Sequence, residues 1–213
     1  AGQPGTTAIH MDSSSFVAWA SDCNVNLGTE DISNSQSNIV STGNYTMAIG
    51  QPGSGVVSLG DGGYATLTFQ RNIINGPGWD FAVFENSFSD VFLELAYVEV
   101  SSNGVDFVRF PSTSNTQDTL QIDAFGSLEA EKINNLAGKY RATFGTPFDL
   151  QDLINEPIID VNAISHVKII DVIGSLNDTY CNFDSQNNKI NDPWPTPFPS
   201  SGFDLDAVGI INE

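Results

Sequence analysis

Residues 64–69 have the sequence Tyr-Ala-Thr-Leu-Thr-Phe, an alternation of side chains that decides the fold class. In an extended chain, Ala65, Leu67 and Phe69 fall on one face and the two threonines fall on the other. The preceding stretch at 60–63, Gly-Asp-Gly-Gly, is typical of a tight turn. The pattern predicts a β-strand with one buried face.

A similar sequence pattern recurs along the chain, where short apolar or alternating runs lie between clusters of Gly, Asn, Asp and Ser. This favours strands over helices. Further strands are expected at 56–59, 79–85, 92–101, 105–110, 166–173 and 203–211. Asn103-Gly104 predicts a hairpin. We expect an all-β, antiparallel, jelly-roll-like β-sandwich with long loops and at most one or two short helices, one of them starting near 146–149.

One domain is expected to span 1–213, because no linker divides the chain. Residues 1–55 are rich in Ser, Asn, Gly and Thr, and we expect them to form an irregular N-terminal lead that packs on the body through Phe16 and Trp19. The first residues, Ala-Gly-Gln-Pro-Gly, resemble the start of a mature protein after removal of a signal peptide. A secreted or cell-surface location is therefore expected.

Acidic residues dominate the charge, since 26 Asp and Glu against 7 Lys and Arg give a net charge of −19. Phosphate backbones and anionic membrane surfaces attract clustered Lys and Arg, so neither nucleic acid binding nor membrane insertion is expected. Solubility of an extracellular protein accounts for most of this charge. Calcium is the other explanation, for carboxylates at defined spacings.

One candidate calcium site is the loop at 184–192, Asp-Ser-Gln-Asn-Asn-Lys-Ile-Asn-Asp. Oxygen-bearing side chains and one backbone carbonyl recur at alternate positions, which suits an ion that binds six to eight oxygens. The loop lacks the Gly and Glu of the helix-loop-helix calcium motif, so a solvated Asn/Asp turn is the alternative. The expected ligands are Asp184, Gln186, Asn188, Ile190 and Asp192.

A second candidate metal site combines Asp80 and Glu85, at the two ends of one expected strand, with Asp204 and Asp206 on the last strand. Neighbouring strands of a sandwich can bring the four together. Packed carboxylates repel one another and need a proton or a cation, and calcium is the simplest solution. The alternative is that some face solvent and the others accept backbone hydrogen bonds.

The proline-rich loop at 193–199 holds Trp194 and Phe198 with little conformational freedom. Such rings stack on sugars or on a flat cofactor, or else they fold back and cap the core. Positive charge, which is scarce in this chain, stands beside an aromatic ring at Lys139, Tyr140 and Arg141. All five residues are candidates for ligand binding, and an ion pair is the alternative for the basic ones.

Cys23 and Cys181 lie in polar, loop-like surroundings. In an oxidising compartment they are candidates for a disulfide, and two free thiols are the alternative. No complete catalytic set is visible, so no enzyme is predicted. Glu85, Glu94 and Glu99 are glycosidase candidates by residue type only.

Several motifs resemble a family of secreted bacterial cell-surface proteins. They are GPGWDFAVFEN at 76–86, FLELAYVEVSS at 92–102, NLAGKY at 135–140, GTPFDL at 145–150, NDPWPTPF at 191–198 and GFDLDAVG at 202–209. The resemblance covers most of the chain and implies a secreted β-sandwich without a specific activity. A more distant similarity to surface lipoproteins of gut bacteria, some of which bind cobalamin, suggests a ligand class.

Together these observations predict a calcium-stabilised module that binds a glycan or another extracellular ligand. Three alternatives remain open at this stage. The first is a capture protein for a cobalamin-type cofactor, with Trp194, Phe198 and Tyr140 as a flat aromatic platform. The second is a glycoside hydrolase with a carboxylate pair, and the third is a structural or adhesive surface protein.

Overall fold

The alternating stretch at 64–69 begins β5 (Tyr64–Ile73), a strand of ten residues in a computed structural model that describes residues 1–213. Ala65 and Leu67 are buried in the main core, whereas Thr66 and Thr68 are half-buried on the opposite face. The burial pattern follows the alternation of the sequence, as expected for a strand with one face on a core. The prediction from this stretch is confirmed.

One sheet has five strands in the order β3-β5-β12-β7-β8. Beside β5 these strands are β3 (Asp22–Asn26), β7 (Ala96–Ser101), β8 (Val108–Arg109) and β12 (Ile164–Asp171). Asn103-Gly104 forms the turn between β7 and β8, where Glu99 pairs with Arg109. Gly104 has a φ of 75°, a conformation that suits glycine.

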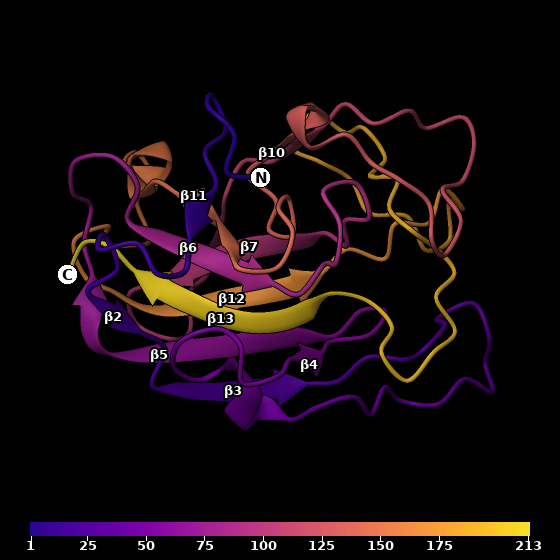
Figure 1. The fold of residues 1–213 in the computed structure, drawn as a ribbon, viewed down its shortest axis with the longest axis horizontal. Helices are drawn as coiled ribbons and strands as arrows, with labels where there is room; N and C mark the ends of the chain where they lie inside the picture. The colour runs from indigo at the N-terminus through magenta and orange to yellow at the C-terminus, as the bar shows by residue number, and fades with distance from the viewer.

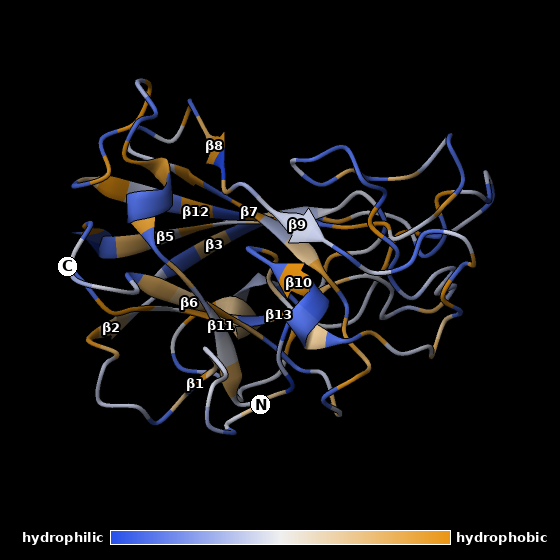
Figure 2. Ribbon diagram, turned by 90° about the horizontal axis from the view of Figure 1, so that it is seen from above, coloured by the Kyte–Doolittle hydropathy of each residue, from blue (hydrophilic) through white to orange (hydrophobic).

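The other sheet has six strands, in the order β1-β11-β6-β13-β2 with β4 also paired to β13. Its members are β1 (Ile9–His10), β2 (Ala18–Trp19), β4 (Val57–Ser58), β6 (Phe81–Glu85), β11 (Phe144–Phe148) and β13 (Asp204–Ile210). A separate pair joins β9 (Thr113–Ser114) to β10 (Ile133–Asn134). Figure 2 shows the two large sheets as separate layers.

All strand pairs are antiparallel, and the long strands alternate between the layers along the chain. The expected all-β, antiparallel sandwich class is thereby confirmed. The main core between the layers includes stacked Phe81 and Phe148, whose ring centroids are 5.3 Å apart, with Phe110 edge-on to both. Aromatic pairs of this kind add stability beyond the apolar area that they bury.

Some boundaries differ from the sequence expectation. The N-terminal lead contributes β1, β2 and β3 to the sheets, so it is more regular than expected. Three 3₁₀ turns replace the one or two helices, namely η1 (Tyr45–Ala48), η2 (Ala130–Lys132) and η3 (Leu150–Leu153). The helix expected to start at 146–149 starts instead at Leu150. Thr146–Phe148 pair with β6, and the Asp149 carboxylate then caps η3.

The expected disulfide is wrong, because Cys23 and Cys181 are free. Cys23 lies on β3, at one edge of the five-stranded sheet. Cys181 lies near Phe183, whose carbonyl accepts a hydrogen bond from Tyr97 on β7, three strands away. Three strand spacings are about 14 Å, whereas a disulfide needs Cα atoms within about 7 Å.

Irregular connections gather at one end of the sandwich, opposite the end where β13 reaches the C-terminus (Figure 1). We call this the loop end. It carries a second, smaller core in which Leu93, Leu95, Ile122 and Ile190 are buried. In Figure 2 apolar segments recur among the polar ones in these loops. β6 ends and β13 begins at the loop end, so both strands place acidic residues there.

Candidate functional site

Six buried carboxyl groups lie together at the loop end, and we call them the carboxyl cluster. Its members are Asp61, Glu85, Glu94, Asp171, Asp192 and Asp204. None is more than 8% exposed, and none forms an ion pair with Lys, Arg or His. Buried charges are normally paired, so a group of unpaired carboxyls requires a physical explanation.

Strand ends bring these residues together. Glu85 is the last residue of β6, Asp171 is the last of β12, and Asp204 is the first of β13. Alternation from Val83 and Ile169, both in the main core, turns Glu85 and Asp171 inward between the two sheets. Carboxyl groups of the two layers therefore face the same interior space at the loop end.

Glu85 is 1% exposed, and neither of its carboxyl oxygens has a hydrogen-bond partner. Burial raises its pKa well above the ordinary value, and the charges of Asp204 and Asp206 raise it further. The nearby backbone N–H groups of Asn86 and Ser87 only moderate this rise. Glu85 is thus a fully buried carboxyl group whose oxygens have no well-formed hydrogen bond.

Glu94 precedes β7, and its carboxyl group has no hydrogen bond within the protein. Its pKa is raised well above the ordinary value, first by burial and then by the charges of Glu85 and Asp204. Gly138 fixes the backbone here, since a Cβ on Gly138 would lie 1.8 Å from the carbonyl oxygen of Glu94. Gly138 also has a φ of 81°, so a side chain there would be strained.

The other members accept defined hydrogen bonds. The Leu95 N–H donates to Asp192 at 2.7 Å, and the Phe203 N–H donates to Asp171 at 2.8 Å. Burial raises the pKa of both carboxyl groups well above the ordinary value, and the charge of Asp61 contributes. The second oxygen of Asp171 has no partner.

Asp61 and Asp204 are the two members with moderate shifts. Burial raises the pKa of each from 3.8 to about 6. Asp61 accepts hydrogen bonds from the Ile32 N–H at 2.9 Å and from the indole N–H of Trp194 at 3.1 Å. Asp204 accepts a hydrogen bond from the Ser58 hydroxyl. These donors limit the rise in pKa that burial causes.

A pocket of about 380 Å³ opens above this cluster, and Glu94 and Asp204 are among its lining residues. Four phenylalanine rings form its apolar wall, in a chain of successive contacts. The centroid distances are 4.9 Å for Phe88–Phe92, 6.2 Å for Phe92–Phe125 and 5.8 Å for Phe125–Phe198. Exposed rings beside buried carboxyls give the pocket an apolar side and a hydrogen-bonding side.

The exposure of these rings is unusual for a core-capping role. Phe88 is 77% exposed, Phe125 is 69% exposed and Phe198 is 40% exposed. Apolar side chains that gather on a surface are typical of interaction sites. Phe198, a predicted ligand-binding residue, lines this pocket, whereas the other rings of the pocket were not predicted from the sequence.

The second predicted metal site is only partly assembled. Glu85 and Asp204 do come together, with Asp206 nearby accepting a hydrogen bond from the Gly53 N–H. Asp80 was wrongly included, because it lies at the opposite end of β6 beside residues 211–212. Its carboxylate binds the N–H groups of Gly76 and Leu150 at 2.8 and 2.7 Å and holds loops in place.

The loop at 184–192 does not gather its five predicted ligands around one point. Asp184 accepts hydrogen bonds from the N–H groups of Ser114, Gln186 and Asn188 and from the side-chain amide of Asn188. Partial burial raises the pKa of Asp184, but these hydrogen bonds outweigh it and leave the pKa below 3.8. This is the Asn/Asp turn that was the alternative interpretation.

The remaining loop positions have other roles. Gln186 is exposed, and Ile190 is buried in the second core. Asp192 belongs to the carboxyl cluster. The Lys189 ammonium group donates to the carboxylate of Asp178 at 2.5 Å and to the carbonyl of Leu176.

Tyr140, Trp194 and Phe198 do not form one aromatic platform. Tyr140 is 5% exposed, and its hydroxyl accepts a hydrogen bond from the Thr7 N–H at 3.2 Å, so it fastens the N-terminal lead. Trp194 lies against Tyr180, with ring centroids 6.4 Å apart, whereas Phe198 contacts Phe125. Three separate environments leave no flat surface shared by these rings.

The basic residues beside Tyr140 have partners within the protein. Arg141 lies 3.5 Å from the carboxylate of Asp90 and stacks over the ring of Phe144 at 4.8 Å. The Lys139 ammonium group lies 5.6 Å from the centre of the Tyr140 ring. The ion-pair alternative holds for Arg141.

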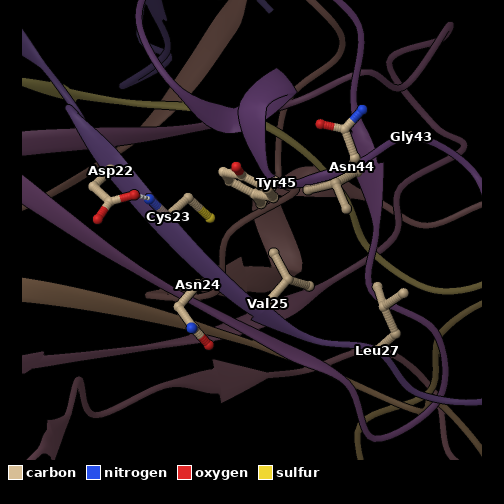
Figure 3. A pocket seen from close by; sticks show the side chains of 9 residues that line it. Asp22, Cys23, Asn24, Val25, Leu27, Gly43, Asn44 and Tyr45 are labelled. Atoms are coloured by element: carbon tan, nitrogen blue, oxygen red, sulfur yellow. Dashed lines mark hydrogen bonds between the residues drawn. The ribbon is translucent and has the colours of Figure 1, made fainter.

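Another pocket lies along the edge strand β3, lined by Cys23, Val25 and Tyr45 among others. Cys23 and Val25 point toward Tyr45, whereas Asp22 and Asn24 point away (Figure 3). Burial raises the pKa of the Cys23 thiol to about 12, and the charge of Asp22 adds to this. A thiol with so high a pKa is a poor nucleophile or metal ligand at neutral pH.

No group of three or more Asp, Glu, His or Cys side chains is arranged to hold a metal ion as the side chains stand. The chain also contains no helix that is long and apolar enough to span a bilayer. Family models of known proteins give no match to this chain, and a search of curated protein sequences finds no match either. The resemblance to bacterial cell-surface proteins therefore stays a prediction.

The sequence reasoning did not assign three cluster members to a site, namely Asp61, Glu94 and Asp171, although Glu94 was a glycosidase candidate by residue type. A usable signal exists for two of them. Glu94 is the only charged residue in the apolar run 92–98, and Asp171 closes the run Val-Lys-Ile-Ile before it. A lone acid in such a run is forced inward with its neighbours. Asp61 stands in a glycine turn and gives no such signal.

Proposed function

We propose that this chain is a secreted or cell-surface module that binds a glycan in the pocket walled by Phe88, Phe92, Phe125 and Phe198. The observation that carries the proposal is the combination of exposed rings and a buried, unpartnered carboxyl group in one pocket. A sugar ring has apolar C–H faces and many hydroxyl donors. The rings suit its faces, and the carboxyl groups of Glu94 and Asp204 suit its hydroxyls.

The energetic argument favours a small set of anchors. Aromatic side chains at binding sites contribute much of the affinity, because they bury large areas at little conformational cost. Glu94 has no hydrogen-bond partner in the protein, so a ligand hydroxyl that bonds to it breaks no hydrogen bond within the protein. Folding has already removed most of the water around the Glu94 carboxyl group, so binding of a ligand adds little further desolvation cost.

A glycan array followed by calorimetric titration of the best saccharide tests this proposal. Replacing Phe125 by Ala is expected to weaken binding at least tenfold, because loss of an anchoring ring costs more than about 1.4 kcal/mol. Phe183→Ala is the matched control, since Phe183 is 48% exposed but does not line the pocket. Equal losses in both variants, or none in Phe125→Ala, would place the glycan elsewhere.

One other surface competes for the same ligand, and the experiment separates it. The outer face of the five-stranded sheet carries Tyr64 and Phe107 around a shallow hollow with Thr66 and Lys168. The Lys168 ammonium group lies over both rings, 4.7 and 5.0 Å from their centres. A loss of glycan binding in Tyr64→Ala, with Phe125→Ala unaffected, would assign the site to this face.

A glycoside hydrolase is the second candidate, and one observation favours it. Glu94 and Asp204 line the same pocket, and burial raises the pKa of both carboxyl groups above the ordinary value. A protonated acid beside an ionised carboxylate is the arrangement that glycosidases need. Release of reducing ends from an array-identified glycan, abolished in Glu94→Gln, would support hydrolysis. Binding without product release would favour the glycan-binding module over the hydrolase.

A further inference from the structure

We infer that the sugar bound in the pocket walled by the four phenylalanines carries a free amino group, which binds as an ammonium ion to Glu94 and Asp204. The inference rests on the proposed function, because it concerns the same pocket, and it narrows the ligand to amino sugars. Its basis is the set of hydrogen-bonding groups that the pocket offers, which includes two buried carboxyl groups and no basic side chain.

The lining of the pocket is acidic and aromatic. Beside the phenyl rings it includes Glu94 and Asp204, each 8% exposed, and it includes no Lys, Arg or His. Among the neutral polar residues of the lining, Thr196 already shares a hydrogen bond with the Ser201 hydroxyl at 2.8 Å. A sugar with a carboxylate, sulfate or phosphate group would meet only like charge here, so the lining disfavours anionic sugars.

Glu94 is the acid that the protein leaves open to a ligand. It is more than nine-tenths buried, its carboxyl group accepts no hydrogen bond from the protein, and it lines the pocket. Asp204 beside it accepts one hydrogen bond, from the Ser58 hydroxyl. Glu85 also has no partner, but it does not line the pocket and is out of reach of a ligand there. An N–H group of a ligand therefore supplies the donor that Glu94 lacks.

The surroundings of Glu94 favour a cation over a neutral donor. Burial raises the pKa of Glu94 well above the ordinary value, and the charges of Glu85 and Asp204 raise it further. The negative charges that oppose ionisation of Glu94 attract a positive group placed beside it. A hydroxyl offers one donor and no charge, whereas an ammonium group offers three donors and neutralises a carboxylate.

The phenyl rings suit the same ligand. Phe92 contacts both Phe88 and Phe125, with ring centroids 4.9 and 6.2 Å apart, so the apolar wall is continuous. An ammonium ion within about 6 Å of a ring centre is attracted by the negative face of the ring. A small ammonium ion alone would leave much of a four-ring wall uncovered. An amino sugar covers the wall with its apolar C–H face and directs its amino group to the carboxyl groups.

Calorimetric titration with matched sugars tests the inference. The probes are the di- and trisaccharides of glucosamine and of galactosamine, each beside its N-acetylated counterpart, at pH 6.5 to keep most of the amine protonated. We expect each free amine to bind at least tenfold tighter than its counterpart, a difference of about 1.4 kcal/mol. Raising the salt concentration from about 50 to about 500 mM is expected to weaken binding of the amine roughly threefold and to leave the N-acetylated sugar nearly unchanged.

Glu94→Gln assigns the preference to the pocket. Glutamine keeps the shape of the side chain, so folding is expected to persist, and thermal unfolding checks it. The preference for the amine is expected to fall below about threefold, with the N-acetylated sugar bound as before. Glu213→Gln removes the same charge near the C-terminus, at the opposite end of the sandwich (Figure 1), and is expected to keep the preference of the parent. The salt dependence needs only the parent protein.

Two outcomes overturn the inference. One is binding of N-acetylated or other neutral glycans as tight as that of the amines, and lost in Phe125→Ala. The pocket then takes neutral glycans, and the proposed function stands without the inference. The other is a preference for the amine that Glu94→Gln leaves unchanged, which would place the ammonium group elsewhere. If neither these sugars nor any glycan of the array binds, the proposed function fails together with the inference.

Discussion

In calcium-free buffer, the buried carboxyl groups predict a fall in stability as pH rises. The pKa of Asp61 and of Asp204 is raised from 3.8 to about 6 on folding. A raised carboxyl pKa means that the folded state holds its proton more tightly than the unfolded state. The resulting stabilisation is complete below pH 3.8 and is lost as pH rises through about 6.

The size of the effect follows from the two shifts. One pKa unit corresponds to about 1.4 kcal/mol, and roughly two thirds of each shift lies between pH 4.5 and 7.5. Each group therefore loses about 2 kcal/mol over this interval. For a chain of this length, the pair lowers Tm by roughly 8–16 °C. Asp184 acts with the opposite sign, but its lowered pKa confines its effect below pH 3.8.

Thermal unfolding in EDTA at the two pH values measures this difference. The double variant with Asp61→Asn and Asp204→Asn has no titrating carboxyl at these positions, so its Tm is expected to fall less than that of the parent. The fall that remains comes from the other buried carboxyl groups with raised pKa values, Glu85, Glu94, Asp171 and Asp192. That comparison separates the two groups from the general repulsion of an acidic chain. A parent protein whose Tm is unchanged or higher at pH 7.5 in EDTA would refute the assignment of raised pKa values.

Three further outcomes test separate parts of the structure. A thiol reagent at pH 8 is expected to modify Cys181 but not Cys23 in the folded protein, and to modify both after unfolding. If neither cysteine reacts even in the unfolded protein, the two form a disulfide. Asp80→Ala is expected to cost about 3 kcal/mol in urea unfolding, because it leaves the loop N–H groups that bind Asp80 without an acceptor. Tyr140→Phe is expected to cost about 1 kcal/mol through the lost contact with Thr7, with glycan affinity unchanged, and a large affinity loss would restore Tyr140 as a ligand residue.

The fold class could be predicted from the sequence because strand periodicity is a local property. Burial in β5 repeats the alternation at 64–69, and the Asn103-Gly104 pair forms the turn it predicts. The N-terminal strands could not be predicted in the same way. β1 and β2 are only two residues long, so they depend on the edges of β11 and β13 that accept them.

The site was harder to predict, because spacing along the chain says little about which strand ends meet. Asp80 and Glu85 are close in sequence, yet the five extended residue steps from Asp80 to Glu85 along β6 set them about 16 Å apart. Glu85 and Asp171 are far apart in sequence, yet the strands that carry them end at the same end of the sandwich. Only the sheet order distinguishes these cases.

Local hydrogen bonding explains why the most regular acidic motif was misleading. At 184–192 the Asp184 carboxylate accepts four hydrogen bonds, from the Gln186 and Asn188 N–H groups of its own turn, from the Asn188 side-chain amide and from the Ser114 N–H. Glu85 ends an apolar strand, and neither of its carboxyl oxygens has a well-formed hydrogen bond. Short polar side chains in loops find backbone partners readily, whereas the backbone N–H groups around a buried strand are mostly used by the sheet. An acid that interrupts an apolar strand is therefore a better sign of a buried carboxyl group with a raised pKa than an acidic loop is.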